Sequence, residues 1–390
     1  MRLSTIIAIA FSFQLMMNLT RPLVTLYGIS LGADAIGIGM ITAAYALFPL
    51  LLAIPIGKVA DIIGDRSPVR IGVAGMMAGT ALPFIFPDIW ALYVSQALVG
   101  VSHIFISISL QNLIGNMSNS QNRDHHFGLF SMAVALSGIV GPVAGGMLAD
   151  YSSYGFAFGM ASVAGLVPMA FAMLLPDSAK PAGQAGIEAE KGSALELLRI
   201  PLLRKALASS ALVLYSRDVF VAYFPLFASD WGMSASTIGW IIGVQGLTMV
   251  LVRLFLARLT ARFGREPVLW ASILVAGVSF MLVPLTTDTL LCGLLSALMG
   301  AGLGCGQPLS MTTTYNASPK HRTGEVLGLR MASNRLSQMI APLFFGLVGA
   351  WTGIIAIFYV SGAFLIGGAF LTAGPGREQR AAPMNDSSNS

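Results

Sequence analysis

The chain has 390 residues, of which 55% are apolar and only 10% are charged. Soluble domains carry about 25% charged residues, so this composition excludes a soluble enzyme. The formal net charge of +5 would suit a nucleic-acid partner, but most basic residues sit in loops between apolar runs, where they orient a membrane protein. We therefore expect a lipid bilayer around the chain and no nucleic acid.

Long apolar runs recur along the chain, several of them near the ~20 residues that cross a bilayer. These runs must be helices, because backbone in lipid has to satisfy its hydrogen bonds within the segment. The sequence predicts an all-α membrane protein with twelve transmembrane helices, at 5–31, 37–56, 70–86, 90–115, 127–148, 156–175, 205–228, 237–257, 268–285, 290–314, 325–349 and 354–373.

The predicted helices fall into two pseudo-symmetric bundles of six. We expect a first bundle over 1–175, a cytoplasmic linker over 176–204 with a short surface helix near 193–199, a second bundle over 205–373 and a cytoplasmic tail over 374–390. The linker is rich in Pro, Gly, Ala and charges, and the tail has no hydrophobic periodicity.

The connecting loops alternate in charge. Those on one side collect Lys and Arg, whereas those on the other side hold neither and carry one aspartate each, Asp34, Asp88, Asp150, Asp230 and Asp288. Cytoplasmic loops collect basic residues, so both termini are expected in the cytoplasm. The expected location is a bacterial inner (plasma) membrane, which the chain crosses many times.

The two predicted bundles repeat each other. Glycines and a proline recur at a spacing of 200 residues, in the pairs Gly64 and Gly264, Gly100 and Gly300, Gly128 and Gly328, Pro142 and Pro342, and Gly146 and Gly346. An earlier stretch recurs at a spacing of 196, in the pairs Arg21 and Arg217, Tyr27 and Tyr223, and Asp34 and Asp230. A duplicated membrane protein of many helices encloses one central cavity between its halves, which indicates transport.

The loop after the second predicted helix holds Gly57, Asp61, Gly64 and Arg66. This pattern resembles the signature loop of the major facilitator superfamily, whose members are usually monomers. In that family the loop is a cytoplasmic latch, and the resemblance implies that Asp61 meets the start of the eleventh helix and Arg330 there. A carboxylate is stabilised at that positive helix end. A tight turn with solvated charges is the other interpretation.

The fifth predicted helix is rich in small residues. Its glycines and proline are Gly138, Gly141, Pro142, Gly145 and Gly146. This segment resembles the signature of the twelve-span drug/proton antiporters within the superfamily. Glycines allow close helix approach and a proline kinks a helix. The alternative interpretation is that these small residues only allow helices to pack closely and say nothing about the direction of transport.

The fourth predicted helix departs from the antiporter pattern. Aligned on Gly100, the position where that group carries a proton-coupling arginine is Gln96. Either the coupling lies elsewhere or protons are not used. Gln96, Gly100, His103 and Ser107 follow one helical face that we expect to line the cavity. His103 is a candidate proton carrier, since histidine changes charge between pH 5 and 8; a neutral hydrogen-bonding group is the alternative. In the repeat, Ser107 becomes Gln307, a further binding candidate.

Charges inside a membrane helix cost at least ~2.5–3.5 kcal/mol each, so each one calls for a function or a partner. Arg21 and Arg217 occupy matching mid-membrane positions, and Asn18 shares the polar face of Arg21. We expect this pair to bind an anionic group of the substrate, because a guanidinium matches carboxylate or phosphate. The pairing also resembles the superfamily's organophosphate exchangers. The alternative is neutralisation of one arginine by Asp218.

The remaining intramembrane polar residues divide into coupling, cavity and structural candidates. Asp218 is the first candidate to carry a coupling proton, with a static ion pair to Arg21 or Arg217 as the alternative. Asn334 and Arg335 are cavity candidates, and Arg335 could instead face the latch. Arg253 lies toward a cytoplasmic end and is expected to reach the interface or join the latch.

The sequence predicts no cofactor and no metal site. The activity that it predicts is secondary active transport of a small organic compound, with an anionic group as one option, by alternating access and proton-coupled efflux. Uptake or exchange of carboxylates or organophosphates, and uniport without protons, are the competing transport hypotheses. An intramembrane enzyme or a receptor-like relative is the remote alternative, because an enzyme would need a nucleophile and base or a metal cluster.

Overall fold

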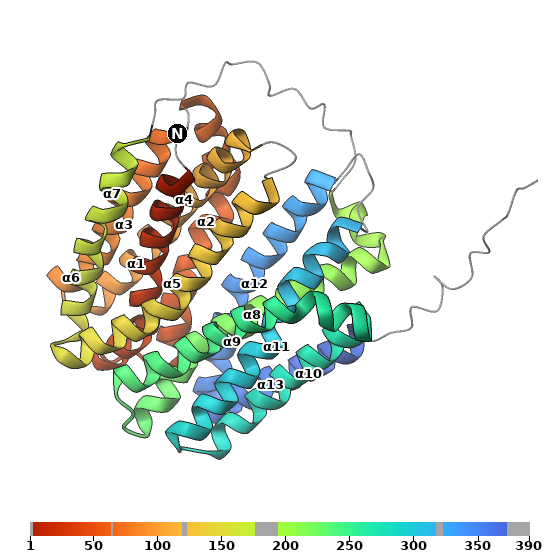
Figure 1. Cartoon of the computed structure of the whole chain (residues 1–390). Helices are drawn as coiled ribbons and strands as arrows, with labels where there is room; N and C mark the ends of the chain where they lie inside the picture. Colours follow the sequence, from red (N-terminus) through yellow and green to blue (C-terminus); the bar gives the residue numbers. More distant parts are fainter. Residues whose placement is uncertain (1–2, 64, 119–122, 176–193, 317–322, 373–390) are drawn as a thin grey trace, which may run out of the picture.

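The structure is a computed structural model that describes residues 3–63, 65–118, 123–175, 194–316 and 323–372. The first bundle contains α1 Leu3–Ser30, α2 Ala35–Ile63, α3 Arg66–Ile85, α4 Ile89–Met117, α5 Arg123–Tyr151, α6 Tyr154–Ala164 and α7 Leu166–Met173. After the 3-10 helix η1 Ala194–Arg199, the second contains α8 Pro201–Asp230, α9 Ala235–Phe263, α10 Arg265–Leu282, η2 Val283–Leu285, α11 Thr289–Asn316, α12 Thr323–Thr352 and α13 Ile354–Thr372. Figure 1 shows the two bundles lying against each other.

The described helices make twelve membrane crossings, because α6 and α7 together form one. The break between them falls at Gly165, three residues before Pro168. A proline has no N–H for the carbonyl four residues earlier, which here belongs to Ala164. The described residues contain no strand, so the predicted all-α fold of twelve crossings is confirmed.

Several helix ends, mostly at the basic side, extend beyond the ranges expected from hydropathy. The helix α8 begins at Pro201 rather than 205, and α5 spans Arg123–Tyr151 rather than 127–148. Hydropathy detects the part of a helix in hydrocarbon, whereas the helix continues into the interfacial layer with polar residues. Within the described ranges, nine helices are long and apolar enough to span a membrane, and α2 and α13 contribute shorter apolar stretches. The crossing with the weakest signal is α12, whose interior carries Arg330 and Arg335.

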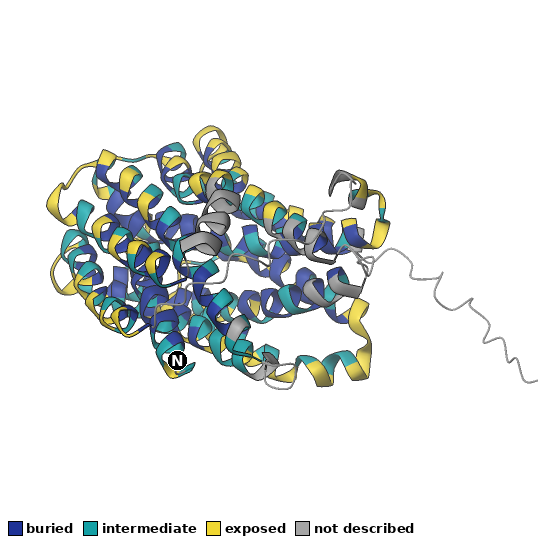
Figure 2. Ribbon diagram, turned by 90° about the horizontal axis from the view of Figure 1, so that it is seen from above, coloured by how far each residue is buried: buried dark blue, intermediate teal, exposed yellow. Residues whose placement is uncertain are grey.

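The outside of the molecule is apolar. Large hydrophobic side chains are exposed all around it, among them Leu254 at 69%, Leu290 at 82% and Trp351 at 85%. In Figure 2 the exposed residues follow the outer rim, and the buried ones fill the interior. A soluble protein of this size would not leave so much apolar surface in water, whereas lipid accommodates it.

The two bundles contact each other mainly through α5 with α9 and through α2 with α12, two pairs that the repeat makes equivalent. Glycines allow the first contact. A Cβ on Gly146 would overlap the carbonyl of Ala235, and a Cβ on Gly239 would overlap the carbonyl of Pro142. Within the first bundle, Gly145 lies equally close to the carbonyl of Leu19 on α1. The glycines of the fifth membrane helix therefore place both α1 and α9 at backbone contact distance.

The bundles are joined at the end that carries the aspartate loops, called here the acidic end. The Asp150 carboxylate accepts hydrogen bonds from the backbone N–H of Ala235 at 3.0 Å and of Ser236 at 2.8 Å. These groups start α9, where the helix dipole stabilises a negative charge. At the α2–α12 contact, the Tyr223 hydroxyl on α8 lies within hydrogen-bond distance of two carbonyls, that of Pro342 in its own bundle at 2.6 Å and that of Ala35 on α2 of the first bundle at 3.4 Å. The opposite end, which carries the basic loops and is called the basic end, has no such described closure.

Candidate functional site

The main cavity lies between the two bundles, on the basic side of the α5–α9 contact. It has a volume of about 230 Å³, and its walls come from α1, α5, α8 and α9. The bundles close where the carbonyl of Gly138 lies 3.0 Å from the position of a Cβ on Gly246. The cavity therefore ends at the middle of the membrane and leads from there toward the basic end.

The wall residues recur at helical spacing, so each helix presents one face. On α1 they are Gln14, Asn18 and Arg21, and on α9 they are Gly246, Met249, Val250 and Arg253. Residues spaced by three and four lie on one side of a helix. The α1 face is polar along its length, whereas the α9 face combines small and apolar residues, and each ends in an arginine. Such a mixed wall suits an organic compound carrying charge.

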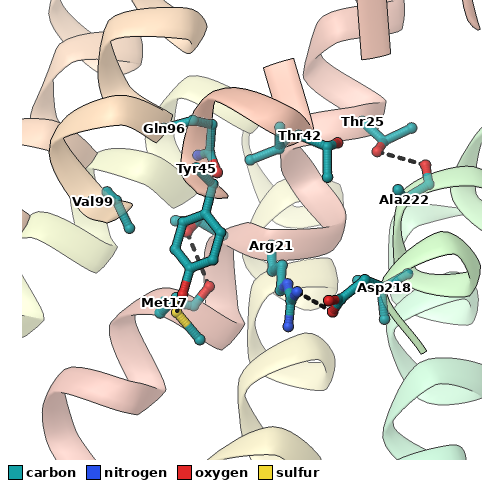
Figure 3. A pocket seen from close by; sticks show the side chains of 12 residues that line it. Met17, Arg21, Thr25, Thr42, Tyr45, Gln96, Val99, Asp218 and Ala222 are labelled. Carbon is teal, nitrogen blue, oxygen red and sulfur yellow. Dashed lines mark hydrogen bonds and ion pairs between the residues drawn. The ribbon is translucent and has the colours of Figure 1, made fainter. Parts of the chain in front are cut away.

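An ion pair between the bundles crosses the site (Figure 3). The guanidinium of Arg21 on α1 donates to the Asp218 carboxylate on α8. The Asp218 side chain is 4% exposed and that of Arg21 is 22% exposed. The other carboxylate oxygen of Asp218 accepts a hydrogen bond of 2.8 Å from Gln338, whose own oxygen accepts from Arg335 at 3.0 Å. Asp218 on α8 therefore binds Arg21 on α1 directly and is linked to Arg335 on α12 through the side-chain amide of Gln338.

The neighbouring Arg217 has a different environment. Adjacent residues on a helix point about 100° apart, and Arg217 faces the main cavity together with Arg21. Its nitrogen Nη2 lies 3.4 Å from the position of a Cβ on Gly138. Within the described part of the chain, Arg217 has no hydrogen-bond or ion-pair partner. The structure thus brings the two predicted substrate arginines to one shared space and leaves one of them unpaired.

A second, smaller space adjoins the ion pair on the side of the first bundle. It measures about 30 Å³, room for about one water, and is lined by Arg21, Tyr45, Gln96 and Asp218. The Tyr45 ring lies 5.9 Å from the Arg21 guanidinium carbon. Gln96 is buried and faces this space in Figure 3. The polar residue that replaces the family's arginine therefore lies beside the ion pair.

His103 and Ser107 lie within the first bundle. The His103 ring contacts those of Phe13 and Tyr45, with centroids 5.7 and 6.1 Å away. Its nitrogen Nε2 is 3.4 Å from the Ser107 hydroxyl, and Nδ1 is buried without a partner among the described residues. Neither residue belongs to the wall of the main cavity. A proton carrier at His103 remains a prediction, with no described contact to the Asp218 network.

Gln307 and Asn334 tie the helices of the second bundle together. The Gln307 amide donates to the carbonyl of Ser210 at 3.1 Å, and its oxygen accepts from Arg330 at 2.8 Å. Asn334 accepts from the Ser210 hydroxyl at 3.0 Å. These contacts join α8, α11 and α12, so in this conformation both predicted substrate residues make structural hydrogen bonds.

The predicted latch falls largely outside the described residues. Gly64 is not described, and neither are the surroundings of Gly57 or the side chain of Asp61. Arg66 donates to the carbonyl of Met173 at 3.2 Å, which connects the start of α3 to the end of α7. The pairing of Asp61 with Arg330 therefore stays a prediction. Most of the expected linker and the tail also lie outside the description, although η1 occupies the position of the expected surface helix.

Sequence reasoning missed the contribution of α9. Gln245, Gly246 and Arg253 line the central spaces, whereas Arg253 was expected to reach the interface or join the latch. The spacing 246, 249, 250 and 253 is a helical face that ends in a charge, and that signal was present in the sequence. In the described part of the chain, no cluster of three His, Cys, Asp or Glu residues could hold a metal ion.

Comparison with known proteins identifies the family. The profile of the Major Facilitator Superfamily matches residues 6–228 and 206–386. The chain belongs to the major facilitator superfamily. Its transporter relatives include an uncharacterized MFS-type transporter of Methanocaldococcus jannaschii, 23% identical over 91% of this chain and 93% of the relative. A class G tetracycline resistance protein of Vibrio anguillarum is 23% identical over 84% of each chain.

Solved transporter structures share the fold. A POT family transporter in complex with 5-aminolevulinic acid superposes with a TM-score of 0.79 over 95% of this chain and 94% of that one, at 14% identity. The protein is thus a multi-pass membrane transporter rather than an enzyme, and it resembles the drug/proton antiporters of its superfamily. The predicted resemblance and the predicted class of activity are confirmed.

Proposed function

We propose that this transporter exports a small organic compound with an anionic group and that Asp218 couples the export to protons. The observation that carries the proposal is the buried Arg21–Asp218 ion pair between the bundles, beside a cavity that also holds the unpaired Arg217. A resistance protein among the relatives supports the outward direction. The basic end is the cytoplasmic end, because cytoplasmic loops collect Lys and Arg.

Alternating access assigns this conformation to one stage of the cycle. The acidic end is closed by the contacts of Asp150 with α9 and of Tyr223 with the carbonyl of Ala35 on α2, and the cavity lies on the basic side, so the compound enters from the cytoplasm. Each Asp218 oxygen accepts a hydrogen bond, the pattern of an ionised carboxylate. When the bundles rock and the acidic end opens, a proton from outside neutralises Asp218 and breaks the ion pair.

Return to the present conformation re-forms the pair and releases that proton to the cytoplasm. Protons then run inward in the return step, while the compound leaves in the forward step. Arg217 supplies the charge that holds the compound during the forward step, since a guanidinium suits carboxylate or phosphate. Gln96 and Tyr45 border the space that the proton crosses.

Uptake of an anion together with a proton is the second candidate. Arg21 is both the partner of Asp218 and part of the cavity wall. A proton on Asp218 releases Arg21 for an anion, so proton and anion would bind cooperatively and move in the same direction. The sign of the coupling separates the two candidates.

The test uses the purified full chain in proteoliposomes with an internal pH indicator. Counterflow of labelled acids, sugars and cationic dyes is measured with a pH gradient in each direction. Export coupled to protons predicts that the compound moves against the proton flux, whereas the uptake candidate predicts that both move together. Substrate flux that neither moves protons nor responds to the gradient in wild type would refute both. Replacing Arg217 by Gln should abolish flux of anions and spare neutral compounds.

A further inference from the structure

Two guanidinium groups in the main cavity have no countercharge. The single negative charge of Asp218 is shared by Arg21 directly and by Arg335 through Gln338. Arg217 and Arg253 both line the cavity, and neither has an ion-pair partner among the described residues. Both side chains are half-buried, so water solvates these charges only in part, and an anion in the cavity would stabilise them.

Arg253 is held in position for this role. Its Nε donates to the carbonyl of Gly304 on α11 at 3.1 Å, which fixes the side chain between α9 and α11, and the residue lines the cavity. This bond uses one of the five donors of the guanidinium, so the terminal nitrogens remain available for an anion. Arg253 lies seven residues beyond Gly246, about 10 Å along the helix axis toward the basic end. The two arginines therefore lie at different depths of one cavity.

A neighbouring amide also lacks an acceptor. The side chain of Gln245 is 2% exposed, and its Nε2 is buried without a partner in the described structure. Gln245 lines a small space of about 10 Å³ together with Arg217, Asn18 and Gly138. A buried donor without an acceptor is rare in proteins, and an oxygen of a bound compound near Arg217 would satisfy it.

We propose that the cavity binds an organic dianion, with one anionic group on Arg217 beside Gln245 and the other on Arg253. This proposal rests on transport through this cavity and adds the class of compound. A dianion carries one negative charge for each of the two wall arginines, Arg217 and Arg253, that have no ion-pair partner among the described residues. The volume of about 230 Å³ is below the usual range of drug-sized pockets, so the dianion is small. Short dicarboxylates and small phosphorylated acids share this chemistry.

The experiment measures binding of succinate and glutarate to the purified full chain in lipid nanodiscs, by titration calorimetry at fixed ionic strength. Butyrate and valerate are the probes of equal length with one charge. Loss of one charge-assisted contact lowers affinity about 10- to 100-fold. We therefore expect a dicarboxylate to bind at least tenfold tighter than the matched monocarboxylate.

Variants assign the preference to Arg253. Arg253→Gln should reduce the ratio of the two affinities to about one, and Arg253→Lys should retain part of it because the charge is kept. Arg262→Gln is the matched control, since this exposed arginine in the last turn of α9 changes the net charge equally. Monodisperse elution of each variant verifies its fold, and the Lys variant tests the idea even if the Gln variant does not fold.

The possible failures are separable. Equal affinities for the two probe classes, no binding of any probe, or equal effects of the Arg253 and Arg262 changes would each overturn the dianion proposal. A dianion preference that depends on Arg253, in a protein that moves no protons, would support this proposal and refute proton coupling. Proton-coupled export of neutral compounds without a dianion preference would support proton coupling and refute the dianion proposal.

Discussion

Replacement of Asp218 by Asn should destabilise the transporter and remove its response to protons. The change keeps the side-chain shape and an acceptor for Gln338 but leaves Arg21 without a countercharge. Breaking a buried ion pair by removing one partner costs about 3–5 kcal/mol. The Arg21 side chain is 22% exposed and lines a cavity, so water compensates in part and the lower end, about 3 kcal/mol, applies.

The magnitude can be measured by a double-mutant cycle. Wild type, Asp218→Asn, Arg21→Gln and the double variant are unfolded by denaturant in the same detergent. If the pair is coupled as the structure indicates, the double variant is more stable than the sum of the single effects predicts, by about 2 kcal/mol or more. Additive single effects would refute the claim that these two residues interact.

The same variant tests the transport mechanism. In proteoliposomes, Asp218→Asn should allow counterflow of substrate, which needs no net proton movement, while uphill transport driven by a pH gradient is lost. Uphill transport that persists at the wild-type rate in Asp218→Asn would refute the assignment of Asp218 as the coupling residue.

Two further predictions follow from backbone contacts. Gly145→Ala places a Cβ against the Leu19 carbonyl and should destabilise the first bundle by about 1–3 kcal/mol, measured by thermal unfolding. Gly367→Ala is the control, because a Cβ there meets nothing within 4 Å, and it should be neutral or slightly stabilising. Asp150→Asn removes the charge at the start of α9 and should shift the population toward an open acidic end by about 0.3–1 kcal/mol, or up to fivefold. Spin-label distances across that end measure the shift, and Asp88→Asn, which caps a helix within one bundle, should leave them unchanged.

The sequence alone determined the membrane architecture. Each crossing is encoded locally by its own apolar run, and the span at 325–349, which corresponds to α12, was predicted in this way although it contains Arg330 and Arg335. The repeat also predicted that Arg21 and Arg217 face one space, and the structure places both on the wall of the main cavity. These features need only local hydropathy and an internal comparison of the two halves.

Only the tertiary structure decided which charges are neutralised. Asp218 is adjacent in sequence to Arg217, yet it pairs with Arg21, 197 residues away, because neighbours on a helix face different sides. From the sequence, Arg253 resembled a residue at the membrane interface. The structure places it on the cavity wall, which extends along α9 from Gly246 to Arg253. Which ion pairs form inside a membrane depends on how whole helices are rotated and how far apart they lie. Contacts such as those of Gly145 and Gly146 set this rotation and separation. They join residues far apart in the chain, so the hydrophobic pattern of one helix does not predict them.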